Sequence, residues 1–211
     1  MNIKDKVIQN FVPKEKIVLF GEDGQKITLE FDKYYCTAVD FAEYIMQKYK
    51  NKFDKMISHI KLQKSIYLCF AHWGGLAKIG ELANNECDKI ISEYLFKDEF
   101  EAWSYGPVVK SVIDFYHFII AKGEEYFKEI KNQEYLFQDC PEVKEYIDDL
   151  LDELFKISDF KLVEITHRDK VWQNHFEPLN DKVSKIIPHN EIITEYADKF
   201  NIKNIDFRKF L

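Results

Sequence analysis

At 211 residues the chain is long enough for one domain with a substantial core, and its 7 glycines and 5 prolines are too few for a disordered or fibrous protein. A net charge of −7, with Arg168 and Arg208 as the only arginines, argues against direct binding of nucleic acid. No signal-peptide core and no membrane-spanning run is visible, so we expect no membrane partner and a location in the bacterial cytoplasm, or in the host cytoplasm if a phage encodes the chain. Four scattered cysteines favour free thiols in a reducing compartment.

The first 35 residues form a separate unit in this interpretation. Two runs rich in β-branched and aromatic residues, Lys16–Phe20 and Lys26–Phe31, flank the turn sequence Gly-Glu-Asp-Gly. They predict a β-hairpin appendage over residues 1–35, followed by a helical domain over residues 36–211. Because an isolated hairpin is marginally stable in water, it should dock on the body or on a partner.

Two helices follow the hairpin in the chain. Apolar residues at helical spacing predict the first over Ala38–Lys50. Ser58 can cap the second, which runs to about Leu76 and should be loosened or ended by Gly74-Gly75. In the second helix, Lys61, Gln63 and Lys64 lie off the apolar stripe and are expected to face solvent, beside a buried stripe that consists of Leu62, Ile66, Phe70 and Trp73.

The stretch Phe100–Phe118 is expected to organise the fold. A short extended run ends at Trp103, Gly106 forms a corner, and Pro107 suits the first position of a helix that closes at Gly123. Apolar residues cover more than one face of this helix, so other helices should surround it. The predicted fold class is therefore mainly α: a compact multi-helix domain around a central apolar helix, with short strands and the N-terminal β-hairpin.

Three further helices are predicted in the C-terminal part, over Glu142–Ile157, Phe160–His167 and Pro188 to about Phe200, with Trp172 on a short turn. The first of them has a clean apolar stripe and an opposite acidic face. That face is either a solvated surface or a docking surface for a basic protein. Its acidic residues are Glu142, Glu145, Asp148, Asp149, Asp152 and Glu153.

No arrangement of residues typical of catalysis is visible. The chain has no phosphate-binding glycine loop and no H-E-x-x-H, and the pair Cys69 and His72 is best explained by helix packing. We therefore predict no enzyme, no metal and no cofactor. One alternative stays open, which is an unrecognised pocket around Glu101, Tyr105 and His167.

Three segments in this order resemble a known family. They are Ile60–Tyr67 (IKLQKSIY), Phe100–Val109 (FEAWSYGPVV) and Leu162–His167 (LVEITH) followed by Val171-Trp172. Together they resemble the Panacea domain, the antitoxin domain related to SocA, over about Ala38–Phe200. The chain departs from the family at Val171, where a proline is common, and at Ser65, where a second leucine is common.

The resemblance implies a mostly helical, non-catalytic domain that neutralises a cognate toxin by direct protein binding. One relative resembles an adaptor that delivers its toxin to a protease. The alternatives are such an adaptor, or a phage or prophage protein that inhibits a host factor. The family-motif residues are Lys61, Leu62, Gln63, Lys64, Glu101, Ala102, Trp103, Tyr105, Gly106, Pro107, Thr166, His167 and Trp172.

Most motif residues are expected to determine the fold. Trp103 and Trp172 read as core anchors, and Thr166 and His167 as side chains that bond free carbonyls at a helix end. If so, partner recognition lies elsewhere, on the hairpin and on the acidic helix, and the partner is a basic toxin. The predicted partner-binding residues are Glu22, Asp23, Lys26, Glu145, Asp148, Asp149 and Asp152.

Overall fold

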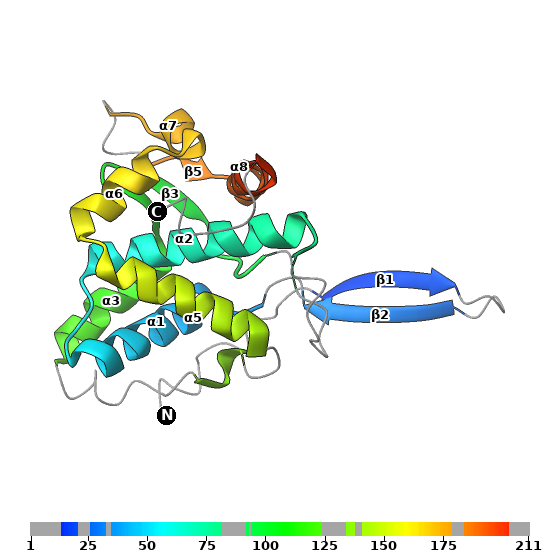
Figure 1. Ribbon diagram of the computed structural model, residues 1–211, viewed down its shortest axis with the longest axis horizontal. Helices are drawn as coiled ribbons and strands as arrows, with labels where there is room; N and C mark the ends of the chain where they lie inside the picture. The colour runs from blue at the N-terminus through cyan, green and yellow to red at the C-terminus, as the bar shows by residue number, and fades with distance from the viewer. Residues whose placement is uncertain are drawn as a thin grey trace.

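The computed structural model describes residues 14–20, 26–32, 35–81, 92, 94–123, 134–137, 141–178 and 184–202. The body is mainly helical, as predicted, with a small three-stranded sheet (Figure 1). The α-helices are α1 (Ala38–Phe53), α2 (His59–Lys78), α3 (Lys110–Lys122), α5 (Pro141–Lys156), α6 (Asp159–His167), α7 (Lys170–His175) and α8 (His189–Ile202). A short 3-10 helix, η3, spans Glu134–Phe137.

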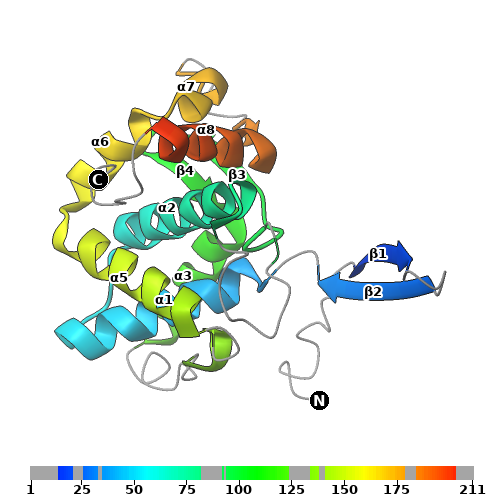
Figure 2. The same cartoon turned by 45° about the vertical axis from the view of Figure 1, so that its right-hand side comes forward.

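Helix α2 is the centre of the body. It lies between α8 on one side and α1, α3 and α5 on the other, and it is buried continuously from Lys61 to Leu76 (Figure 2). The Ser58 hydroxyl caps it by accepting a hydrogen bond from the Lys61 backbone N–H at 3.1 Å. The predicted central helix was therefore the wrong one, because α3 fully buries only Val112 and Ile119.

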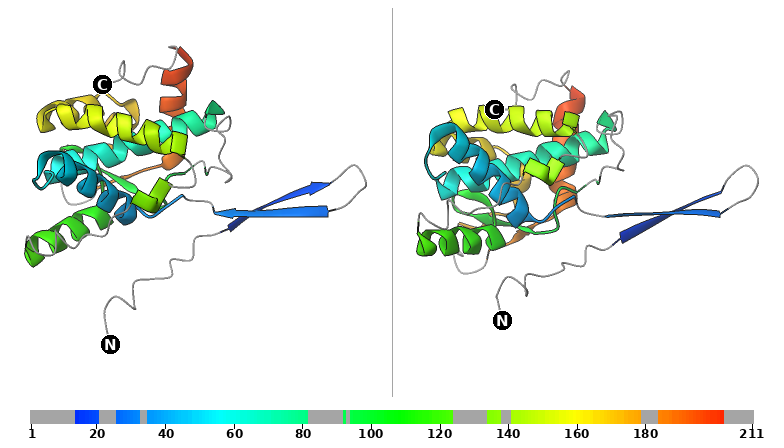
Figure 3. Two further views of the ribbon diagram at one scale, coloured as in Figure 1. Left: turned by 60° about the horizontal axis from the view of Figure 1, so that its bottom comes forward. Right: turned by 90° about the horizontal axis from the view of Figure 1, so that it is seen from below.

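The two glycines in α2 serve close packing. Helix α8 crosses α2 at a steep angle (Figure 3) and meets it where Gly74 and Gly75 lie. A Cβ added at Gly74 would sit 2.3 Å from Ile193 Cγ1, and one at Gly75 would sit 2.8 Å from a ring carbon of Phe200. These glycines do not end the helix, because α2 continues past them to Lys78, two residues beyond the expected end near Leu76.

The corner after Trp103 is a strand turn and not a helix start. Strand β3 (Phe100–Trp103) pairs antiparallel with β4 (Gly106–Val109), and α3 begins only at Lys110. Pro107 therefore opens no helix. It lies opposite Ala102 in the ladder, where a strand edge tolerates a residue without an N–H.

The third strand of this sheet comes from a distant part of the chain. Strand β5 (Ile186–Ile187) pairs antiparallel with β3, so that the strand order is β4-β3-β5. Before β3, the carbonyl oxygens of Tyr94 and Leu95 accept hydrogen bonds from the Tyr35 and Cys36 N–H groups, just before α1. Phe100 and Ala102 face the core and Glu101 and Trp103 face outward, as the period of a strand requires.

Two N-terminal strands, β1 (Lys14–Phe20) and β2 (Lys26–Asp32), pair antiparallel with Lys16 opposite Glu30. Their side chains, and the turn that carries Glu22 and Asp23, lie outside the described residues. An appendage that docks on a partner therefore stays a prediction. None of the described helices is long and apolar enough to cross a lipid bilayer.

Candidate functional site

The polar motif residues of α2 are buried, and the prediction that they face solvent was wrong. Lys61 Nζ donates to the carbonyl oxygens of Phe155, at 3.4 Å, and of Ile157, and lies 3.7 Å from Asp159 Oδ1. These acceptors lie at the end of α5 and the start of α6. Lys61 therefore holds the link between these two helices by bonding its backbone carbonyls.

Gln63 closes the outer edge of β4. Its side-chain nitrogen donates to the Val109 carbonyl at 3.1 Å, and its side-chain oxygen accepts from the Val109 N–H at 2.8 Å. The carboxamide thus makes the pair of bonds that a neighbouring strand would make. A buried strand edge must find such partners, because each unpaired backbone group costs about 1–3 kcal/mol.

Lys64 supports the start of the same strand. It is 1% exposed, and its Nζ donates to the Pro107 carbonyl at 2.7 Å. Burial favours the neutral amine and lowers the pKa of Lys64 to about 7. Gly106 packs against the Lys64 side chain and has φ +94°. A Cβ at Gly106 would lie 2.9 Å from Lys64 Nζ and 2.7 Å from Thr166 Oγ1. The corner therefore requires glycine for both its backbone angle and its space.

The third motif segment meets the same corner from α6 and α7. Thr166 Oγ1 donates to the Val163 carbonyl at 3.1 Å, and Trp172 Nε1 donates to the Trp103 carbonyl at 3.2 Å. The His167 ring stacks on Trp172 with centroids 3.9 Å apart and bonds to the Ser104 backbone, while its buried Nε2 has no partner among the described residues. Burial, aided by the nearby Lys64, lowers the pKa of His167. Two segments far from the turn in sequence, one on α2 and one on α6 and α7, thus hold it in place.

The tip of this turn faces solvent. Trp103 is 39% exposed and Tyr105 is 62% exposed, so the expectation that Trp103 anchors the core was wrong, whereas Trp172 is buried. Outward alternation along β3 places Trp103 on the same face as Glu101, whose Oε2 accepts from Trp103 Nε1 at 2.9 Å and from Ser184 Oγ. The site therefore has a buried anchor and an exposed tip.

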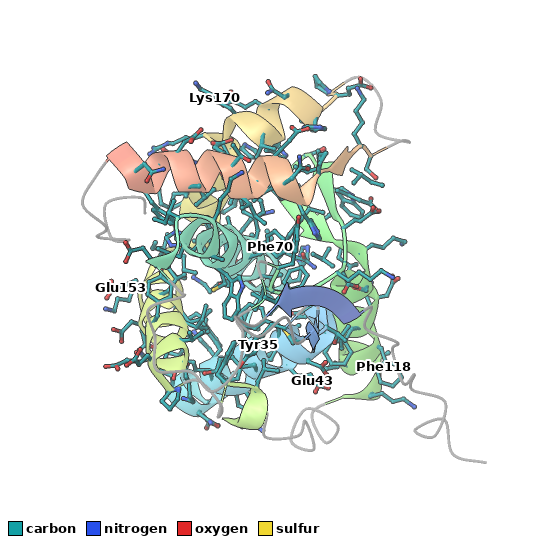
Figure 4. The ribbon with its side chains drawn as sticks, turned by 90° about the vertical axis from the view of Figure 1, so that its right-hand side faces the viewer. Tyr35, Glu43, Phe70, Phe118, Glu153 and Lys170 are labelled. Carbon is teal, nitrogen blue, oxygen red and sulfur yellow. The ribbon has the colours of Figure 1, made fainter. Side chains whose placement is uncertain are left out.

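The acidic face of α5 is partly used by α1. Asp148 accepts from Tyr44 and pairs with Lys48 at 3.0 Å and Lys144 at 2.7 Å, and Asp152 pairs with Lys52 at 2.9 Å. Burial alone would raise the pKa of Asp148, but its hydrogen bonds from Lys144, Tyr44 and Lys48 outweigh that effect and lower it. Glu145 and Asp149 stay exposed. Figure 4 shows Glu153, another member of this face, on the outer side of α5.

One buried polar cluster was missed. Asp169, 3% exposed, accepts from Tyr67 at 2.8 Å, Tyr196 at 2.9 Å and Lys199 at 2.6 Å. Burial raises the pKa of Asp169, and burial together with the Asp169 charge raises the pKa values of both tyrosines. The cluster connects α2 and α8 to the loop before α7. Its only sequence signal was a lone aspartate beside the Thr166-His167 motif.

Cys69 and His72 lie within the core. His72 Nδ1 lies 2.9 Å from the Tyr146 hydroxyl of α5, and burial lowers the pKa of His72 to about 3 and raises that of Cys69. A neutral imidazole and a protonated thiol fit helix packing. Within the described part of the chain, no three His, Cys, Asp or Glu side chains are grouped to hold a metal ion.

The comparison with known protein families confirms the resemblance. Residues 82–173 match the family described as antitoxin SocA-like, Panacea domain. This range contains the second and third motif segments but not the first, and it is shorter than the Ala38–Phe200 expected from the motifs. No curated protein and no solved structure matches the chain.

Proposed function

We propose that this protein is an antitoxin that neutralises a cognate toxin by binding it directly. The observation that carries the proposal is the match of residues 82–173 to the SocA-like antitoxin family. The net charge of −7 favours a basic toxin, because opposite fields accelerate association and orient the partners. The role is one of binding, not of catalysis.

The contact surface we propose includes the N-terminal hairpin and the exposed part of α5. On α5, Glu145 and Asp149 are the candidates, since Asp148 and Asp152 are already paired with lysines of α1. On the hairpin, Glu22, Asp23 and Lys26 keep the role proposed from the sequence. Deleting residues 1–35 should abolish neutralisation, while the far-ultraviolet circular dichroism of the helical body stays unchanged.

Co-expression with the product of the neighbouring reading frame tests the function. We expect that product alone to stop growth, and this protein to restore growth and to co-purify with it as a complex. If the neighbour is harmless, or if growth is not restored, the proposal fails. Restored growth without a stable complex, and with toxin levels that recover in a protease-deficient strain, would indicate the adaptor role instead.

A further inference from the structure

The outward face of the three-stranded sheet carries a carboxylate between two exposed apolar side chains. Glu101 lies directly opposite Ile186 of β5, which is 49% exposed. Trp103 lies two residues further along β3 on the same face and is 39% exposed. Directly opposite residues and next-but-one residues on one face of a strand are near neighbours. The three side chains therefore form one surface, which we call the Glu101 patch.

Among the described residues, hydrogen bonds reach only one oxygen of the Glu101 carboxylate. Trp103 Nε1 and Ser184 Oγ both donate to Oε2. Within the described ranges no donor bonds to Oε1, and no lysine or arginine pairs with Glu101. Lys185, directly before β5, pairs with Glu177 instead. The patch thus presents a negative charge that this part of the chain does not neutralise.

Buried side chains fix the backbone of the strands that carry the patch. Lys64 and Gln63 bond to the carbonyls of Pro107 and Val109, and the Trp172 indole bonds to the carbonyl of Trp103 itself. A fixed strand turn loses little conformational freedom when a partner binds, which favours affinity. Exposed tryptophan and tyrosine are also the side chains that contribute most to protein interfaces. Tyr105, at the tip, adds the second aromatic ring.

We propose that the Glu101 patch binds an arginine side chain of the toxin. A planar guanidinium can stack on the indole of Trp103 while it donates to Oε1 of Glu101, whereas a lysine ammonium offers only a point charge. Charge complementarity with the acidic chain selects a basic partner over a second copy of this protein. This inference rests on the proposed antitoxin function and adds the recognition chemistry.

The test is a calorimetric titration of the neighbouring reading frame's product with wild-type protein, Glu101→Gln and Trp103→Ala. Glutamine keeps the acceptor for Trp103 and Ser184 but removes the charge. We expect Glu101→Gln to weaken binding by about tenfold or more, and the slope of log Kd against log salt to become shallower. Trp103→Ala should weaken binding to a similar degree. The control, Asp198→Asn on the exposed face of α8, removes one negative charge away from the patch and should change neither quantity.

The two proposals fail in different ways. Wild-type affinity and salt dependence in Glu101→Gln would overturn the Glu101 patch and leave direct neutralisation intact. If the wild-type protein itself does not bind the neighbouring product, both proposals fall. Unfolding temperatures of all variants, measured alongside, show that a loss of binding is not a loss of fold. A single arginine in the partner whose change to lysine reproduces the Glu101→Gln effect would identify the other half of the contact.

Discussion

Helices α2 and α5 both carry charged side chains on the face opposite an apolar stripe, yet the two faces lie in different environments. On α2, Lys61, Gln63 and Lys64 are buried and bond to backbone carbonyls. On α5, Glu145 and Asp149 face solvent. The difference comes from neighbours: α2 is enclosed by helices on both sides and by β4, whereas one side of α5 is open. A polar face in the sequence of a helix therefore predicts solvent-exposed side chains only when the helix lies at the surface of the fold.

The largest expected effect comes from the corner that α2 supports. Gly106→Val should destabilise the fold by about 4 kcal/mol or more, through backbone strain at positive φ and overlap with Thr166 and Lys64. Gly80→Val is the matched control, because Gly80 has φ +83° but no atom within 4 Å of an added Cβ. Both variants carry the backbone strain, so the difference between their free energies of unfolding in urea measures the cost of the overlap at Gly106. Equal losses would show that Lys64 and Thr166 do not confine the corner.

The next largest loss of stability is expected for Gln63→Leu. Leucine leaves both polar groups of Val109 buried without partners, and we expect a loss of about 2–4 kcal/mol in the free energy of unfolding. Gln47 of α1, whose amide donates to Asn51 at the surface, supplies the control, Gln47→Leu, with an expected change of about 0.5 kcal/mol or less. A comparable loss in the two variants would contradict the distinction between buried and exposed polar faces.

Lys64 of α2 should make the stability of the fold depend on pH above neutrality. Its folded pKa of about 7 lies below the ordinary lysine value of 10.5. Between these values the unfolded chain binds a proton that the native protein does not, so stability rises with pH. The Lys64 contribution approaches about 1.4 kcal/mol per pH unit above pH 7. Lys64→Met should flatten the rise between pH 7 and pH 9 in denaturant unfolding. An unchanged slope would mean that Lys64 stays protonated in the fold.

The smallest effect is expected on the open face. The double substitution Glu145→Gln and Asp149→Asn should change stability by about 0.5 kcal/mol or less, because neither side chain is buried. Asp148→Asn, which loses the charge that pairs with Lys48 and Lys144, should cost more. Thermal unfolding at low and high salt measures both. If the double substitution lowers the stability more than Asp148→Asn does, the distinction between exposed and paired carboxylates on α5 is wrong.

The sequence predicted most helices because their apolar periodicity and caps are local. The Ser58 cap and the apolar stripe of α5 are examples. It failed where distant segments decide the outcome. Pro107 suits a helix start, but pairing with β3 and the bonds from Gln63 and Lys64 make Gly106–Val109 a strand. Trp103 suits a core, yet the register of β3 points it outward. The only local signal of Asp169 was its place beside the Thr166-His167 motif, since its partners lie on α2 and α8.

The carboxamide of Gln63 has one more consequence, which concerns aggregation at high protein concentration. An uncovered strand edge invites the strand of another molecule, and this is a common route to aggregation. Here a side chain from a helix occupies the hydrogen-bonding positions of β4 at Val109, and the proline at 107 offers no donor beside them. Gln63, together with Lys64 on the Pro107 carbonyl, covers this edge of the sheet, so we expect it not to pair with a strand of a second chain.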